Sequence, residues 1–143
     1  MRSKFVDEYN HDDVAEGYDL DVLNEKNPIR DGFKDTLKWV IAVAQIRKES
    51  RVLELGSGTG ILTEMIPGCQ ELICVDISQK MEDIALERIG SRKTRVFVRE
   101  DILGVFERNL GKFDIILSTY TIHHLTESEK RFFFEAVWNS LRM

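Results

Sequence analysis

The chain has 143 residues, of which 43% are hydrophobic and 31% are charged, and its formal net charge is −5 at pH 7. This length is typical of a single domain, residues 1–143, and a domain of this size buries roughly 68 to 70% of the surface of its unfolded chain, which excludes wholesale disorder. No apolar run reaches the roughly 18 residues that span a membrane, and the N-terminus lacks the apolar centre of a signal peptide, so we expect a cytoplasmic protein without membrane partners.

The first part of the chain is acidic. Residues 1–31 hold nine acidic and four basic residues, so the whole net charge of −5 lies in this segment. The remaining residues are balanced and offer no basic stripe for a phosphate backbone, which favours a small-molecule substrate and no nucleic acid. Within residues 1–27, Val14, Tyr18 and Leu23 form a weak helical pattern, and we predict an N-terminal flap here.

The first strong helix signal is Asn27-Pro28. Asparagine is a good helix cap, and proline suits the first helical position. Apolar residues then recur at helical spacing from Ile29 to Ala44. The pattern predicts a helix over residues 28–47.

Residues 51–143 alternate between short apolar runs and helical patterns. The predicted strands are 51–56, 71–76, 94–101 and 113–120, and the predicted helices are 61–66, 78–90, 102–110 and one that begins after Thr126, where Thr126 and Glu129 form a capping box. Strands that alternate with helices pair in parallel, because each helix crosses over the sheet. We therefore predict an α/β fold, a Rossmann-like three-layer α/β/α arrangement with a mostly parallel sheet.

Two groups of residues are predicted to belong to the core. The last helix must cover the sheet, so most of its aromatic residues are expected inside: Phe132, Phe133, Phe134 and Trp138. Cys69 and Cys74 lie in apolar sequence with no histidine nearby, a spacing that matches neither a zinc site nor a disulfide framework. We predict that both cysteines are reduced and packed, and that there is no metal site.

A glycine-rich turn, Gly56-Ser57-Gly58-Thr59-Gly60, joins the first predicted strand to a helix. Glycines allow a sharp turn and the close approach of a ligand, and the free amides of a helix start favour an anionic group. A nucleotide-type ligand suits this turn, and a plain connection between strand and helix is the alternative. Asp76 ends the second strand, where parallel sheets bind ligands and a carboxylate suits the hydroxyls of a ribose. Alone, Asp76 would be a charge at a helix start, but the two features together favour a ligand site.

The turn departs from the dinucleotide-binding fingerprint, because Ile61 stands where its third glycine would be. This disfavours a nicotinamide-dependent oxidoreductase, which stays as an alternative. The segments ELGSGTG, CVDIS, REDIL and FDIILSTYTIHHL together resemble the class I S-adenosylmethionine-dependent methyltransferases, in particular their small-molecule and uncharacterised branch. The resemblance implies S-adenosyl-L-methionine as cofactor, S-adenosyl-L-homocysteine as product and methyl transfer to a small-molecule acceptor.

The resemblance also implies which residues bind the cofactor. Asp76 would hold the ribose hydroxyls, and Asp101 would hold the adenine amino group, unless Asp101 is only a helix cap. Tyr18 would close the pocket from the flap. The complete implied set is Tyr18, Glu54, Gly56, Ser57, Gly58, Asp76, Ile77, Asp101, Ile102 and Ser118.

Methyl transfer is an in-line displacement at a sulfonium, so alignment and exclusion of water matter more than a strong acid. A base near neutral pKa helps where the nucleophile carries a proton, and His123 or His124 is the available imidazole. Only one of two adjacent side chains easily faces the pocket, and we favour His123, with Tyr120 as the other catalytic candidate. A histidine satisfied by packing or by a helix-start hydrogen bond is the alternative.

Members of the family usually have seven strands, whereas four are predicted here. The absent strands would flank the fourth strand, so we expect a homo-oligomer that pairs through this apolar edge, or a chain shortened at its C-terminus. A second alternative for the function is therefore a cofactor-binding module without catalysis.

Overall fold

The computed structural model describes residues 1–90 and 95–143, and its centre is a four-stranded sheet in the order β3-β2-β1-β4. All three strand pairs are parallel, which confirms the predicted sheet. The strands are β1 (Arg51–Leu55), β2 (Glu71–Asp76), β3 (Arg95–Arg99) and β4 (Ile115–Ser118). Thr94, predicted to begin the third strand, lies outside the described residues.

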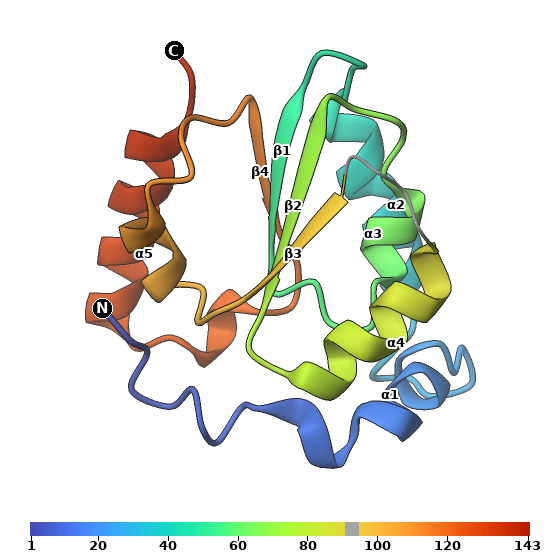
Figure 1. Cartoon of the computed structure of the whole chain (residues 1–143). Helices are drawn as coiled ribbons and strands as arrows, with labels where there is room; N and C mark the ends of the chain where they lie inside the picture. The colour runs from blue at the N-terminus through green and yellow to red at the C-terminus, as the bar shows by residue number, and fades with distance from the viewer. Residues whose placement is uncertain (91–94) are drawn as a thin grey trace.

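Helices cover both faces of the sheet (Figure 1). The α-helices are α1 (Ala15–Val22), α2 (Phe33–Ala44), α3 (Ile61–Met65), α4 (Gln79–Ile89) and α5 (Glu127–Ser140), and the 3-10 helices are η1 (His11–Asp13), η2 (Gly104–Arg108) and η3 (Ile122–His124). Helices α2, α3 and α4 lie on one side, and α5 lies on the other. The predicted three-layer, Rossmann-like α/β/α fold is confirmed.

The two core clusters follow from the alternation of side chains along the strands. On β1, Val52 packs with α2 and α3 residues such as Leu37 and Leu62. The next residue, Leu53, points the other way and packs with Val105 of η2 and Phe133 of α5. Because nearly every β1 and β2 residue is buried, the strands read as continuous apolar runs.

The helix predicted over residues 28–47 is wrong at its start, since α2 begins at Phe33. The Asn27 side chain does accept a hydrogen bond, from the amide of Ile29 at 3.1 Å, but it closes a local turn and no helix follows directly. Gly32 has φ +77°, a left-handed conformation that cannot continue an α-helix. The helix therefore starts only after this glycine.

Two further expectations need correction. The helix predicted over 102–110 is the short 3-10 helix η2, which ends at Asn109 in a left-handed conformation with φ +47°. Of the aromatic residues of α5, Phe133 is buried, but Phe134 and Trp138 are 57% and 66% exposed. They lie on the helix face that points away from the sheet, so coverage of the sheet does not require them.

The burial of the two cysteines and the position of β4 in the sheet can be compared with the sequence analysis. Cys69 and Cys74 are free and buried, as expected. β4 is an edge strand of the described sheet. Phe113, two residues before β4, forms two backbone hydrogen bonds with the end of the chain: its amide donates to the Ser140 carbonyl, and its carbonyl accepts from the Arg142 amide. Residues 140–142 therefore pair with the chain just before this edge strand. Self-association through β4 stays a prediction.

The N-terminal residues cross the end of the sheet at which the strands finish (Figure 1, blue). We call residues 1–13 the N-terminal strap. Helix α1 follows it and is anchored to the glycine-rich turn, because the Thr59 hydroxyl donates to Asp19 at 2.5 Å and Arg88 pairs with the same carboxylate. Across residues 1–90 and 95–143, no helix combines the length and the apolar sequence needed to cross a membrane.

The capping box of α5 is present as predicted and provides a test of local stability. The Thr126 hydroxyl accepts from the Glu129 amide, and the Glu129 carboxylate accepts from the Thr126 amide at 2.7 Å. We expect Thr126→Ala to lower the free energy of unfolding by about 1 kcal/mol in urea titrations. Glu135→Ala, an exposed change on the same helix, is the control and should stay within about 0.5 kcal/mol. Equal losses in both variants would contradict the role of the box.

Candidate functional site

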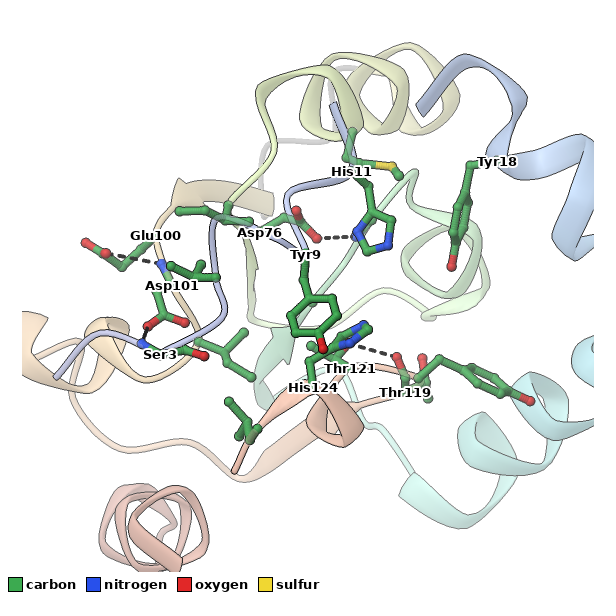
Figure 2. A pocket seen from close by; sticks show the side chains of 18 residues that line it. Ser3, Tyr9, His11, Tyr18, Asp76, Glu100, Asp101, Thr119, Thr121 and His124 are labelled. Atoms are coloured by element: carbon green, nitrogen blue, oxygen red, sulfur yellow. Dashed lines mark hydrogen bonds between the residues drawn. The ribbon is translucent and has the colours of Figure 1, made fainter. Parts of the chain in front are cut away.

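A cavity lies where the strands end, between the glycine-rich turn, the beginning of α4, the residues after β3 and β4, and the N-terminal strap (Figure 2). We call it the main cavity because it gathers most of the predicted site residues. Its volume is about 110 Å³. Carboxylates, imidazoles and aromatic rings face it together. The lining residues are Ser3, Val6, Tyr9, His11, Tyr18, Gly56, Gly58, Asp76, Ile77, Met81, Glu100, Asp101, Ile102, Thr119, Tyr120, Thr121, His124 and Leu125.

The carboxylate of Asp76 holds the glycine-rich turn in place. One oxygen accepts from the Gly58 amide at 2.8 Å, and the other accepts from the Ser78 amide at 2.9 Å. Burial raises the pKa of Asp76, while these two hydrogen bonds and the nearby His11 act in the opposite direction. Asp76 thus links β2, the turn and the beginning of α4 at one wall of the cavity.

Asp101 follows β3 and is buried at another wall. Its carboxylate accepts from the Ser3 amide of the strap at 2.5 Å and from the Leu103 amide. Burial raises the pKa of Asp101, and the two amide hydrogen bonds oppose this rise. Asp101 therefore acts as a local cap for the following turn and also faces the cavity, so the two interpretations of this residue are compatible.

A smaller cavity of about 40 Å³ adjoins the first, and the two share Tyr18, Gly56, Gly58, Thr119 and Tyr120 in their walls. Glu54 and Ser57 line only the smaller one. The Glu54 carboxylate accepts from the Thr63 hydroxyl at 2.7 Å and from the Cys74 thiol at 3.7 Å. Burial raises the pKa of Glu54 to about 7, although the Thr63 hydrogen bond lowers it.

The hydroxyl of Ser57 is an unsatisfied group in this smaller cavity. It is buried and has no hydrogen-bond partner among the described residues. A buried hydroxyl without a partner costs free energy, so such groups commonly mark a place where a ligand or water binds. Ser57 and Glu54 thus present polar groups at one end of the combined space.

The histidine that lines the cavity is His124, whereas the sequence analysis favours His123. His123 is exposed and lines neither cavity, whereas His124 is half-buried and stacks on Tyr9, with ring centroids 3.8 Å apart and planes at 28°. The 3-10 helix η3 turns the first imidazole outward and the second inward. Burial, together with the charges of His123 and His11, lowers the pKa of His124 to about 4.

Of the other predicted site residues, four line the main cavity and Ser118 does not. Tyr18, Ile77, Ile102 and Tyr120 line the main cavity. Tyr120 is 48% exposed and has φ +54°, a strained conformation that directs its ring against Phe33, at 4.9 Å between centroids. Ser118 lines neither cavity, because its hydroxyl donates to the Leu55 carbonyl at 3.1 Å and joins β4 to β1. The role expected for Ser118 in cofactor binding stays a prediction.

Sequence reasoning missed the contribution of the strap. Ser3, Val6, Tyr9 and His11 line the cavity, and no pattern in residues 1–13 indicates this, because the segment lacks a strong periodicity. The lining residues Thr119 and Thr121 had a usable signal, since they directly follow β4 at the ligand-binding end of a parallel sheet. In residues 1–90 and 95–143, no group of three or more potential ligand side chains is arranged to hold a metal ion.

Comparison with known proteins identifies the family. Residues 52–143 match the family described as a methyltransferase domain, and the chain belongs to this family. An uncharacterized methyltransferase of Anoxybacillus flavithermus is 30% identical over 131 residues, which are 91% of this chain and 58% of that protein. A ribosomal RNA small subunit methyltransferase A of Nostoc is 30% identical over 79 residues, 54% of this chain and 29% of that protein. The family match confirms the resemblance to methyltransferases.

A solved structure supports the fold. The N-methyltransferase NodS from Bradyrhizobium japonicum, in complex with S-adenosyl-L-homocysteine, is similar with a TM-score of 0.69 over 93% of this chain and 68% of that chain. At 20% identity this likeness shows the fold alone. The chain spans less than two thirds of the length of the two curated relatives named above.

Two glycines of the turn provide a matched test of its packing. Gly56 and Gly58 both have left-handed φ angles, +74° and +54°, but a Cβ atom at Gly56 would lie 2.1 Å from the Thr121 hydroxyl, whereas one at Gly58 meets nothing within 4 Å. We expect Gly58→Ala to cost about 1 kcal/mol of unfolding free energy for its φ, and Gly56→Ala about 1 to 3 kcal/mol more for overpacking. Urea titrations compare the two variants. Equal losses would mean that the Thr121 contact has no energetic weight.

Proposed function

We propose that the protein transfers a methyl group from S-adenosylmethionine to a small-molecule acceptor. The observation that carries this proposal is the convergence of the glycine-rich turn, Asp76 and Asp101 on one cavity. The three come from separate parts of the sequence, after β1, β2 and β3, and the parallel sheet brings their ends to the same edge. Membership of the methyltransferase family favours this function over the nicotinamide-dependent alternative.

The residues present fit the parts of this cofactor. The carboxylate of Asp76 suits the ribose hydroxyls, and that of Asp101, beside the apolar Ile102, suits the amino group of the adenine. At the other end, the unsatisfied Ser57 hydroxyl and the buried Glu54 suit the charged amino acid part. The space beside Gly58 is open, so the cofactor can approach the backbone there.

The bound cofactor supplies a methyl group on a positively charged sulfur, which an acceptor nucleophile attacks in line. The protein's task is then to align the two and to exclude water. Tyr120 and Thr119, which face both cavities, are placed to form the wall between the cofactor and the acceptor. Tyr18 adds an aromatic ring from α1 to both cavities.

We propose that His124 accepts the proton that the acceptor loses during methyl transfer. Because the pKa of His124 is lowered to about 4, its imidazole is neutral near pH 7 and has a nitrogen that can accept a hydrogen bond. It can orient an O–H or N–H nucleophile and take its proton as the new bond to carbon makes that proton more acidic.

A small acceptor fits this site better than a nucleic acid. Residues of the strap line the cavity, and residues 1–31 are acidic, so a phosphate backbone would meet negative charge there. A relative that methylates ribosomal RNA aligns with only 54% of this chain. The acceptor is therefore proposed as a small molecule with an O–H or N–H group.

Calorimetric titration with S-adenosylhomocysteine tests cofactor binding, with NAD titrated in parallel. We expect binding of the former only. Asp76→Ala should weaken binding by about 1.5 to 3 kcal/mol, and Asp76→Asn, which keeps an oxygen for the Gly58 amide, should lose about half of this. The exposed change Asp83→Ala is the control and should bind as the wild type. Unchanged affinity in folded Asp76 variants, or tighter binding of NAD, would refute the assignment.

A screen for product formation tests the acceptor. S-adenosylhomocysteine released from S-adenosylmethionine is measured with small amines, phenols and carboxylic acids, and separately with protein-free ribosomal RNA. We expect turnover with a small molecule, lowered by about 10²- to 10⁴-fold in His124→Ala and unchanged in His123→Ala. Methylation of the RNA alone would contradict the small-molecule acceptor, and equal rates in the two histidine variants would contradict the role of His124.

A further inference from the structure

The N-terminal strap interacts with the same two carboxylates that the proposed function assigns to the cofactor, through a hydrogen bond to Asp101 and through a charge near Asp76. The Ser3 amide is hydrogen-bonded to Asp101 at 2.5 Å, and both residues are buried. Figure 2 shows His11 pointing toward the carboxylate of Asp76, whose charge it stabilises. Asp101 is the proposed partner of the adenine, and Asp76 is that of the ribose. The Ser3 amide thus occupies the position of the adenine amino group at Asp101, and His11 occupies the space beside the Asp76 carboxylate.

Further contacts fasten the strap in this position. The Lys4 amide donates to Glu129 of α5 at 2.6 Å, and the Ser78 hydroxyl at the beginning of α4 donates to Asp12 at 2.5 Å. Between these two points, Val6 is only 7% exposed and lines the main cavity. Tyr9 stacks on His124. The strap is therefore fastened to the site at several points between Ser3 and Asp12.

The space that remains is too small for a complete cofactor. The main cavity holds about 110 Å³ and the adjoining one about 40 Å³. Cavities that bind small molecules and cofactors measure roughly 300 to 1,000 Å³. An adenosine group can enter only if residues that now line the cavity move. The lining residues outside the sheet and the connections that follow its strands are those of the strap and Tyr18 of α1, and the strap contributes four of them.

We propose that residues 1–13 are an internal competitor of the cofactor, which binds only when the strap releases Asp101 and Asp76. This proposal rests on the proposed function and adds a control of access to the same site. The strap-closed form reduces the apparent affinity for the cofactor by the fraction of molecules that are open. The cofactor in turn favours the open form, because it binds that form alone.

A competitor differs from a lid in one measurable respect. A lid closes over a bound ligand, so its amides become better protected, whereas a displaced competitor loses its hydrogen bonds. We expect saturating S-adenosylhomocysteine to speed amide hydrogen exchange in residues 2–13 while it slows exchange in residues 56–60 and 76–78. Slower exchange in the strap as well would overturn the proposal, because the strap would then be a lid.

Substitutions in the strap provide the second measurement. Ser3→Pro removes the amide hydrogen that Asp101 accepts and leaves the cavity's carboxylates unchanged. We expect it to tighten the binding of S-adenosylhomocysteine by about three- to tenfold in calorimetry. Tyr9→Ala removes the stack on His124 and should act in the same direction. Glu8→Ala, an exposed change on the same segment, should leave the affinity unchanged.

The outcomes separate this proposal from the proposed function. Tighter binding by Ser3→Pro and Tyr9→Ala, or binding by these variants where the wild type binds none, supports the competitor. Equal or weaker binding by both variants, with a wild type that binds, overturns the competitor and leaves the proposed function intact. If neither the folded wild type nor any variant binds S-adenosylhomocysteine, the proposed function fails, and the competitor fails with it.

Discussion

The carboxylate of Asp76 is the interaction on which the shape of the site depends. One of its oxygens accepts a hydrogen bond from the Gly58 amide and the other from the Ser78 amide, so the carboxylate joins the glycine-rich turn to the beginning of α4. Without this bridge, two backbone amides at the cavity wall would lose their acceptor, which is costly in a buried place. Because the turn then has one conformation, the unsatisfied Ser57 hydroxyl and the open space beside Gly58 are held in position before any ligand arrives.

The sequence was sufficient for the sheet and for the meeting of the glycine-rich turn, Asp76 and Asp101 at one cavity. Strands such as β2 carry continuous apolar runs, and the turn glycines and Asp76 have a physical reason to meet at the ends of parallel strands. The start of α2 could not be predicted, because the cap and proline at Asn27-Pro28 have the same local chemistry in a turn as in a helix, and only Gly32 decides between them. Local pattern alone does not show which of two valid uses the chain adopts.

The predicted site residues that line neither cavity, His123 and Ser118, have a common explanation. Whether His123 or His124 faces inward depends on the 3-10 turn of η3, and a shift of one residue reverses the answer. Ser118 faces away because its hydroxyl joins two strands, a contact between residues 63 positions apart. The strap is the extreme case, since its contacts to Asp101 and Glu129 span 98 and 125 positions. Side-chain direction and long-range contacts are properties of the folded chain, and periodicity does not report them.

The carboxyl group of the buried Glu54 is partly protonated at neutral pH. Since the pKa of Glu54 is about 7, roughly half of the molecules carry a proton there at neutral pH. A positively charged group placed against this carboxylate would favour its ionised form and send that proton to the solvent. Binding of a cationic ligand at the smaller cavity is then coupled to proton release, and the heat that accompanies it depends on the ionisation enthalpy of the buffer. The same residue, buried under α3, thereby makes the occupancy of the site sensitive to small changes of pH around neutrality.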